Sequence, residues 1–219
     1  MMTVSRWIDE LKRQTIQADR WVRQRLEQFQ PYRHYAVQPE TWNSQYRGLE
    51  WDWLNDLDEL SRYAMIAGYI RRLKPGGSVL DVGCGVGLLQ QQLAGIYKRY
   101  LGIDISVESL KMARPRQDSS THFLVADAAT FVPPYAVDTV VFNECLYYFE
   151  HPFEVVAHYR SFLKRQGLVI ISMYHETTPT RIWTGLSQRF RLVDGIRLEH
   201  LTGKDWTVKV FTATGDNFV

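Results

Sequence analysis

The segment VLDVGCGVGLL, residues 79–89, decides the fold. Its first half is a short run of branched apolar residues, which is typical of a buried strand, and its end begins a helical pattern. Gly83, Gly85 and Gly87 lie between the two, and glycines let the chain turn sharply and let a ligand approach the backbone closely. The segment therefore predicts a strand, a glycine-rich turn and a helix.

The same alternation continues along the chain. Strand-like apolar runs follow at residues 100–105, 122–127, 138–143 and 167–174. Continuous apolar strands separated by helices predict a parallel sheet that is covered on both faces. Residues 191–201 and 206–213 predict two more strands, and the short turn between them permits only antiparallel pairing. A helix is expected to begin at Pro152 and to close at Arg165 and Gly167.

The first part of the chain has a different pattern of apolar and aromatic residues. Apolar residues recur at helical spacing over residues 4–29, residues 31–56 are expected to be irregular and rich in aromatic side chains, and a second amphipathic helix follows up to Leu73. We therefore divide the chain into an N-terminal helical and aromatic segment, residues 1–56, and an α/β domain, residues 57–219.

Composition restricts the class of protein. Lys and Arg total 26 against 24 Asp and Glu, a net charge of +2, which argues against nucleic acid as a partner. Two cysteines and six scattered histidines show no metal-ligand spacing, so no metal is expected. The N-terminus lacks the apolar core of a secretory signal, and no apolar run approaches the roughly 20 residues that span a bilayer. We expect a cytoplasmic protein with no membrane association, as a monomer or homodimer.

Acidic residues end the strands beside the glycine-rich turn. Asp104 ends the second strand, and Asp127 ends the third with Ala128 beside it. The carboxyl ends of parallel strands meet at one edge of the sheet, where a carboxylate can accept hydrogen bonds from ribose hydroxyls. The glycine pattern alone also fits a turn without a ligand, and the two acids favour a ligand site. A dinucleotide is disfavoured, because the third glycine comes one residue early and Asp81 suits an ammonium group better than a pyrophosphate.

The motifs VLDVGCGVGLL, YLGIDIS, FLVADA and DTVVFNECLYYF resemble those of class I S-adenosylmethionine-dependent methyltransferases, over about residues 60–213. The resemblance implies a Rossmann-like, seven-stranded, mostly parallel sheet with an antiparallel last strand, helices on both faces, and an N-terminal helical lid. It implies S-adenosylmethionine as cofactor, with S-adenosylhomocysteine as product. The cofactor-binding residues it implies are Asp81, Gly83, Cys84, Gly85, Gly87, Asp104, Ile105, Asp127, Ala128 and Asn143.

The expected chemistry is an in-line displacement on an activated methyl group, for which the enzyme supplies alignment and excludes water. A hydroxyl acceptor also needs a general base. The candidates are Glu144, after the fourth strand, and His175, after the fifth. Each has a structural alternative: Glu144 as an ion-pair partner for a basic residue, and His175 as a loop residue bonded to nearby backbone.

Aromatic residues near this edge predict an acceptor site. Tyr46 and Trp51 precede the α/β domain, and Tyr147 and Tyr148 follow the fourth strand. We expect these four side chains to bind the substrate, with core packing as the alternative. Arg62 is placed to reach the carboxylate of the cofactor.

Finer similarities of RYAMIAGYI and NECLYYF favour a small-molecule acceptor, either a saccharide or a natural product carrying a hydroxyl or amine. An RNA or protein methyltransferase is the first alternative. The near-neutral charge argues against it, as does Asn143-Glu144-Cys145-Leu146 in place of the N/D-P-P-Y/F tetrapeptide of enzymes that methylate planar amine nitrogens. A non-catalytic protein that binds S-adenosylmethionine is the second alternative.

Overall fold

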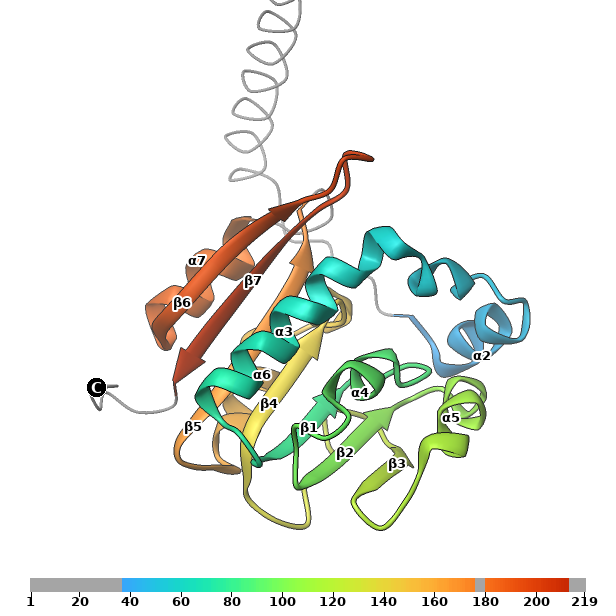
Figure 1. Ribbon diagram of the computed structural model, residues 1–219, viewed down its shortest axis with the longest axis horizontal. Coiled ribbons are helices and arrows are strands. Elements are labelled where there is room, and N and C mark those ends of the chain that lie inside the picture. The colour runs from blue at the N-terminus through green and yellow to red at the C-terminus, as the bar shows by residue number, and fades with distance from the viewer. Residues whose placement is uncertain (1–36, 176–179, 213–219) are drawn as a thin grey trace, which may run out of the picture.

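A computed structural model describes residues 37–175 and 180–212 of the chain (Figure 1). The helix expected over residues 4–29 lies outside the described residues. The described part contains one mixed sheet with helices on both of its faces, as Figure 1 shows.

Seven strands form the sheet in the order β3-β2-β1-β4-β5-β7-β6. Their bounds are β1 Ser78–Val82, β2 Arg99–Asp104, β3 Thr121–Val125, β4 Val137–Asn143, β5 Leu163–Tyr174, β6 Arg191–Glu199 and β7 Asp205–Thr212. Strands β1 to β5 pair in parallel, and β7 is antiparallel to both β5 and β6. The predicted mostly parallel sheet with an antiparallel last strand is confirmed, although β6 and not β7 lies at the edge.

Two apolar layers enclose the sheet. On one face lie α3 Leu60–Leu73, α4 Leu88–Leu93 and α5 Val107–Ala113, and on the other lie α6 Pro152–Arg160 and α7 Thr180–Arg189 (Figure 1). Side chains alternate along a strand, so Val79 of β1 joins the first layer whereas Leu80 and Val82 join the second. Among the described helices, none is long and apolar enough to cross a membrane.

The end of α6 differs from the prediction. The helix ends at Arg160, and β5 begins at Leu163, where it pairs with Val137. Lys164, expected in the last helical turn, instead forms an ion pair of 2.7 Å with Asp138 of β4. This long-range pairing prevails over the basic-turn pattern, so the polar residues before Gly167 form the exposed start of a long strand.

Residues 31–56 are not irregular throughout, as the sequence predicted, because Pro39–Arg47 forms helix α2. Proline is tolerated in the first turn of a helix, and Glu40 near the start and Arg47 near the end complement the helix dipole. Short 3-10 turns over Asp52–Asn55 and Leu57–Glu59 then lead into α3. Figure 1 shows α2 beside α5, near the carboxyl end of β2.

Candidate active site

The glycine-rich turn between β1 and α4 depends on left-handed backbone. Gly83, Gly85 and Gly87 have φ angles of 70°, 54° and 80°, which favour glycine over any residue with a side chain. The amides of Gly83 and Cys84 donate to the carbonyl of Ile103 at 2.8 and 3.0 Å and so fix the turn to the end of β2. A Cβ on Gly85 would lie 2.9 Å from the Tyr46 hydroxyl, so these glycines also permit a close approach.

Asp104 faces this turn. Its carboxylate accepts hydrogen bonds from the amides of Gly85 and Ser106, both at 2.8 Å. Burial raises the pKa of Asp104, and the amide donors oppose that effect. A carboxylate offers about four lone-pair positions, so the two amides orient the group and leave it able to accept ligand hydroxyls. Ile105 follows directly and is half-buried.

Asp127 and Ala128 lie at the same edge of the sheet. Val125, the last residue of β3, pairs with Asp104, so Asp127 lies two residues beyond the strand end rather than on it. The exposed Asp127 carboxylate accepts the amide of Ala129 at 2.9 Å. The carbonyl of the buried Ala128 accepts the Tyr159 hydroxyl at 2.8 Å, which fixes the backbone of this loop.

Asp81 lies beneath the turn and is only 1% exposed. The Tyr100 hydroxyl donates to its Oδ2 at 2.5 Å, and its Oδ1 has no hydrogen-bond partner within the described part of the chain. Burial raises the pKa of Asp81 to about 7, and the Tyr100 bond partly opposes this. Asp81 is therefore a buried carboxyl group that lacks half of its hydrogen bonds.

A buried arginine connects α3 to the end of β4. The Arg62 guanidinium is 1% exposed and donates to the Asn143 side-chain oxygen at 2.7 Å, to the Tyr63 hydroxyl at 3.0 Å and to Glu59 at 3.0 Å. Lys204, in the turn between β6 and β7, binds the other oxygen of Glu59 at 2.9 Å. Arg62 is thus charged, buried and rigidly held beside Asn143.

Glu144 follows β4 with a left-handed φ of 59°. Its carboxylate accepts the Ser172 hydroxyl at 2.7 Å, the Tyr174 amide at 2.8 Å and the Tyr147 hydroxyl at 3.2 Å. Burial raises the pKa of Glu144, whereas the charge of Arg62 and these donors oppose the rise. Glu144 is therefore a precisely oriented carboxylate in a partly desolvated position.

His175 lies at the same end of the sheet. It directly follows Tyr174, whose amide binds Glu144, and its own amide donates to the carbonyl of Asp205 at 3.1 Å. The His175 side chain is half-buried. This bond ties the backbone of His175 to the start of β7, in agreement with the structural alternative.

Aromatic side chains from α2 and from the segment after β4 meet. The ring of Trp42 meets that of Tyr148 edge-on, with 4.9 Å between the ring centroids, and the centroids of Tyr148 and Tyr147 are 4.6 Å apart. The ring centroid of Trp51 lies 5.7 Å from that of Trp42 and 6.5 Å from that of Tyr46. The structure thus brings all four predicted substrate residues into one aromatic cluster.

Trp42 is the member of that cluster that the sequence did not single out as a site residue. Trp42 and Tyr46 are four residues apart, which places them on one face of a helix. Because the segment was expected to be irregular, the sequence did not indicate this shared face.

Two hollows flank these residues. A cavity of about 180 Å³ lies between α2 and the glycine-rich turn, lined by Tyr46, Trp51, Val86 and Arg116 among others. A groove of about 940 Å³ lies between α6 and α7, beside Phe153 and Gly185, and its lining includes no predicted site residue. Within residues 37–175 and 180–212, no group of three or more His, Cys, Asp or Glu side chains is placed to hold a metal ion.

Comparison with known proteins agrees with this geometry. A family model described as "Methyltransferase domain" matches residues 80–171. The ubiquinone biosynthesis O-methyltransferase of Glaesserella parasuis is 31% identical over 111 residues, 47% of each chain. That of Thiobacillus denitrificans is 34% identical over 102 residues, 44% of each chain. The chain therefore matches about half the length of these curated relatives.

Solved structures share the fold at low identity. The N-methyltransferase NodS from Bradyrhizobium japonicum, in complex with S-adenosylhomocysteine, superposes with a TM-score of 0.65 at 19% identity, over 77% of this chain and 97% of that one. The magnesium protoporphyrin IX methyltransferase of Synechocystis gives 0.64 at 18% identity, over 82% and 99%. Residues 80–171 therefore match a methyltransferase domain, and the strand order and the glycine-rich turn beside Asp104 agree with the fold of class I S-adenosylmethionine-dependent methyltransferases.

Proposed function

We propose that this protein transfers a methyl group from S-adenosylmethionine to a hydroxyl or amine of a small molecule, of the saccharide or natural-product type. The observation that carries the proposal is the Asp104 carboxylate, held by the amides of Gly85 and Ser106 beside a turn of left-handed glycines. Such an arrangement suits a ribose, because a fixed carboxylate can accept both hydroxyls while the bare backbone lets the sugar approach.

The remaining cofactor residues suit the two ends of the ligand. Asp127 and the amide of Ala128 lie where an adenine edge would follow the ribose. At the other end, Arg62 and Asn143 offer a buried cation and an amide for the amino-acid part, with Glu59 already balancing part of the Arg62 charge. Asp81 at the end of β1, Cys84 in the turn and Ile105 directly after Asp104 complete the proposed cofactor site. When bound, S-adenosylmethionine supplies a methyl group on a positively charged sulfur, which needs no further activation.

For the acceptor, we propose the aromatic cluster of Trp42, Tyr46, Trp51, Tyr147 and Tyr148. Aromatic faces from α2 and from the loop after β4 can stack on a planar or saccharide acceptor and exclude water. These rings already contact one another, so α2 acts as the lid over the site.

Glu144 is our first choice as general base. Its pKa is raised by burial, which brings the group closer to the range in which a carboxylate accepts a proton effectively. Ser172 and the Tyr174 amide fix two lone pairs, so the carboxylate keeps one orientation toward the Tyr147 side of the site. His175 is the second choice, one residue beyond Tyr174.

A hydroxyl acceptor is favoured over an amine. A neutral amine needs no base, so an oriented, partly desolvated carboxylate serves an acceptor that must lose its proton as the new bond forms. The names of the ubiquinone biosynthesis O-methyltransferases, at 31% and 34% identity, support the same preference. Among the structural neighbours, NodS is named an N-methyltransferase, so amines belong in the acceptor screen.

Calorimetric titration with S-adenosylhomocysteine tests the cofactor. We expect binding by the wild-type protein and at least about tenfold weaker binding by Asp104→Asn, because charge-assisted hydrogen bonds to the ribose are lost. The exposed Asp56 provides the matched control Asp56→Asn, which should bind like the wild type. Absence of binding heat from the folded wild-type protein would refute the proposal. Transfer of a labelled methyl group to sugars, phenols and amines would then identify the acceptor class.

A further inference from the structure

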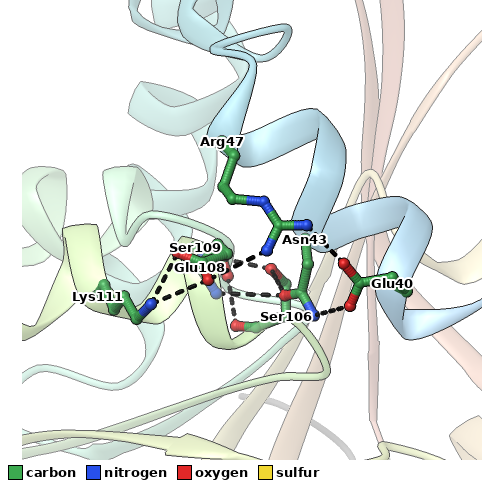
Figure 2. Close-up of polar contacts among 7 residues, drawn as sticks. All are labelled: Glu40, Asn43, Arg47, Ser106, Glu108, Ser109 and Lys111. Carbon is green, nitrogen blue, oxygen red and sulfur yellow. Dashed lines mark hydrogen bonds and ion pairs between the residues drawn. The ribbon is translucent and has the colours of Figure 1, made fainter.

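Helix α2 is joined to the turn after β2 by a specific polar contact. The side-chain oxygen of Asn43 accepts the Ser106 hydroxyl at 2.9 Å and the Glu108 amide at 3.3 Å (Figure 2). Arg47, one turn further along α2, lies 3.5 Å from the Glu108 carboxylate and also pairs with Glu40. Arg47 and Glu40 are exposed, and exposed ion pairs contribute little. The Asn43 bonds are therefore the specific part of the contact.

The residue that Asn43 contacts also orients Asp104. Ser106 donates its amide to Asp104 Oδ1 at 2.8 Å. The hydroxyl oxygen of Ser106 accepts the Ser109 amide at 3.1 Å, as Figure 2 shows. Ser106 is fully buried, so its hydroxyl depends on protein partners. Asn43 accepts the hydroxyl proton and leaves the oxygen lone pairs to the Ser109 amide. The side chain of Asn43 thus completes the hydrogen bonding of the Ser106 turn.

A second contact reaches the other oxygen of Asp104. Tyr46 lies three residues after Asn43 on α2, and its hydroxyl lies against Gly85. The amide of Gly85 is the donor to Asp104 Oδ2. Burial raises the pKa of Tyr46, and the nearby charge of Asp104 adds to the rise. Helix α2 therefore rests on both of the residues whose amides hold the Asp104 carboxylate.

We propose that Asn43 is a positioning residue, which sets the orientation of the Asp104 carboxylate through Ser106 and so couples the docking of α2 to the binding of ribose hydroxyls. The coupling is reciprocal: a ligand that binds the oriented carboxylate stabilises α2 in its docked place. The inference rests on the proposed function for the identity of the ligand, but not for the contact itself.

The test compares Asn43→Ala with two matched variants. The side-chain nitrogen of Asn43 also donates to Glu40 at 3.3 Å, so Asn43→Asp is combined with Glu40→Gln. This double variant keeps an oxygen acceptor for Ser106 and Glu108 without placing two carboxylates together, and Ser44→Ala changes the adjacent exposed side chain of the same helix. Each protein is titrated with S-adenosylhomocysteine and with its 2′,3′-dideoxy analogue, which lacks both of the hydroxyls that Asp104 would accept. Comparing the two ligands separates loss of ribose recognition from general loosening of the lid.

We expect Asn43→Ala to bind S-adenosylhomocysteine about tenfold more weakly while binding the dideoxy analogue with nearly unchanged affinity. Asn43→Asp combined with Glu40→Gln should restore most of the loss, and Ser44→Ala should match the wild type. Equal weakening toward both ligands would overturn the proposal, since Asn43 would then act only through the lid. Unchanged affinity in Asn43→Ala would also overturn it.

Hydrogen exchange in the ligand-free protein tests the role of Asn43 independently of the proposed function. The Ser106 amide bonds to Asp104 and not to Asn43, so its hydrogen exchange reports on the positioning itself. In ligand-free protein we expect exchange at this amide to accelerate about tenfold in Asn43→Ala relative to Ser44→Ala. If the wild-type protein binds no S-adenosylhomocysteine, the proposed function fails, and this exchange rate alone decides the role of Asn43: acceleration supports it and an unchanged rate refutes it.

Discussion

Replacing Asp81 by asparagine is expected to stabilise the ligand-free protein at high pH and to lose that advantage at low pH. The carboxyl group is 1% exposed, and one of its oxygens has no hydrogen-bond partner in the described part of the chain. Burial moves its pKa from 3.8 to about 7. Between these values the folded protein holds a proton that the unfolded chain has released, so wild-type stability falls as pH rises from about 4 to about 7.

The size of the effect follows from the same two values. The difference between 3.8 and about 7 corresponds to about 4 kcal/mol of lost stability above pH 7, and about 2 kcal/mol of it is already lost at about pH 5. Asparagine keeps an acceptor for the Tyr100 hydroxyl but places an unpaired amide where Oδ1 lies, at a cost of about 1–3 kcal/mol. The net expectation for Asp81→Asn is a gain of about 1–3 kcal/mol near pH 9 and little or no gain near pH 5.

Urea unfolding of both proteins near pH 5 and near pH 9 measures this. The change in the Asp81→Asn effect between the two conditions should be about 2–3 kcal/mol, and the unpaired amide does not enter that change, since its cost is the same at both pH values. Asp56→Asn, at an exposed position, should show no such dependence. An Asp81→Asn effect of the same size at both pH values would show that the carboxyl group titrates normally and would refute the reasoning.

Two further predictions concern catalysis and packing. Glu144→Gln should lower methyl transfer to a hydroxyl acceptor about a hundredfold or more in a labelled-cofactor assay, because it removes the proposed general base. The affinity for S-adenosylhomocysteine should stay within about twofold of wild type. Glu154→Gln, at an exposed position on α6, should change neither quantity, and an unaffected rate in Glu144→Gln would remove Glu144 from the mechanism. Gly185→Ala should lower the free energy of unfolding by about 1–3 kcal/mol, because the new methyl group would lie 2.4 Å from the Phe153 ring. In Gly68→Ala, in α3, the new methyl group would have no neighbouring atom within 4 Å, so the free energy of unfolding should instead rise by up to about 1 kcal/mol. Similar thermal or urea midpoints for Gly185→Ala and Gly68→Ala would contradict the packing of α7 on α6.

Much of the fold follows from local patterns. The apolar runs predict β1 to β5, because β1, β2, β4 and the second half of β5 are buried almost throughout. β3, next to β2, is buried only at alternate positions. The sequence did not predict that β7 lies between β5 and β6, because strand order beyond a hairpin depends on contacts distant in the chain. The same reason explains the error at the end of α6, where Lys164 pairs with Asp138 across 26 residues.

In the candidate site, as in the fold, the sequence predicted the contacts that follow from neighbouring strands and not those between distant residues. The position of Asp104 beside Gly85 follows from adjacent parallel strands that end at one edge, and the structure has this contact. The bond from Arg62 to Asn143 joins residues 81 positions apart, so no local pattern specifies it. The contacts of α2 with Ser106 and Gly85 were likewise out of reach, since the helix itself was not predicted.

At Glu144 the backbone conformation that favours stability and the side chain that the proposed reaction needs are in conflict. A side chain in the left-handed region carries a penalty of roughly 1–2 kcal/mol that glycine would avoid. Glycine at this position would relax the chain and delete the carboxylate that Ser172 and Tyr174 hold. Selection for thermal stability alone would therefore favour glycine at this position, and the more stable protein would lack the proposed general base.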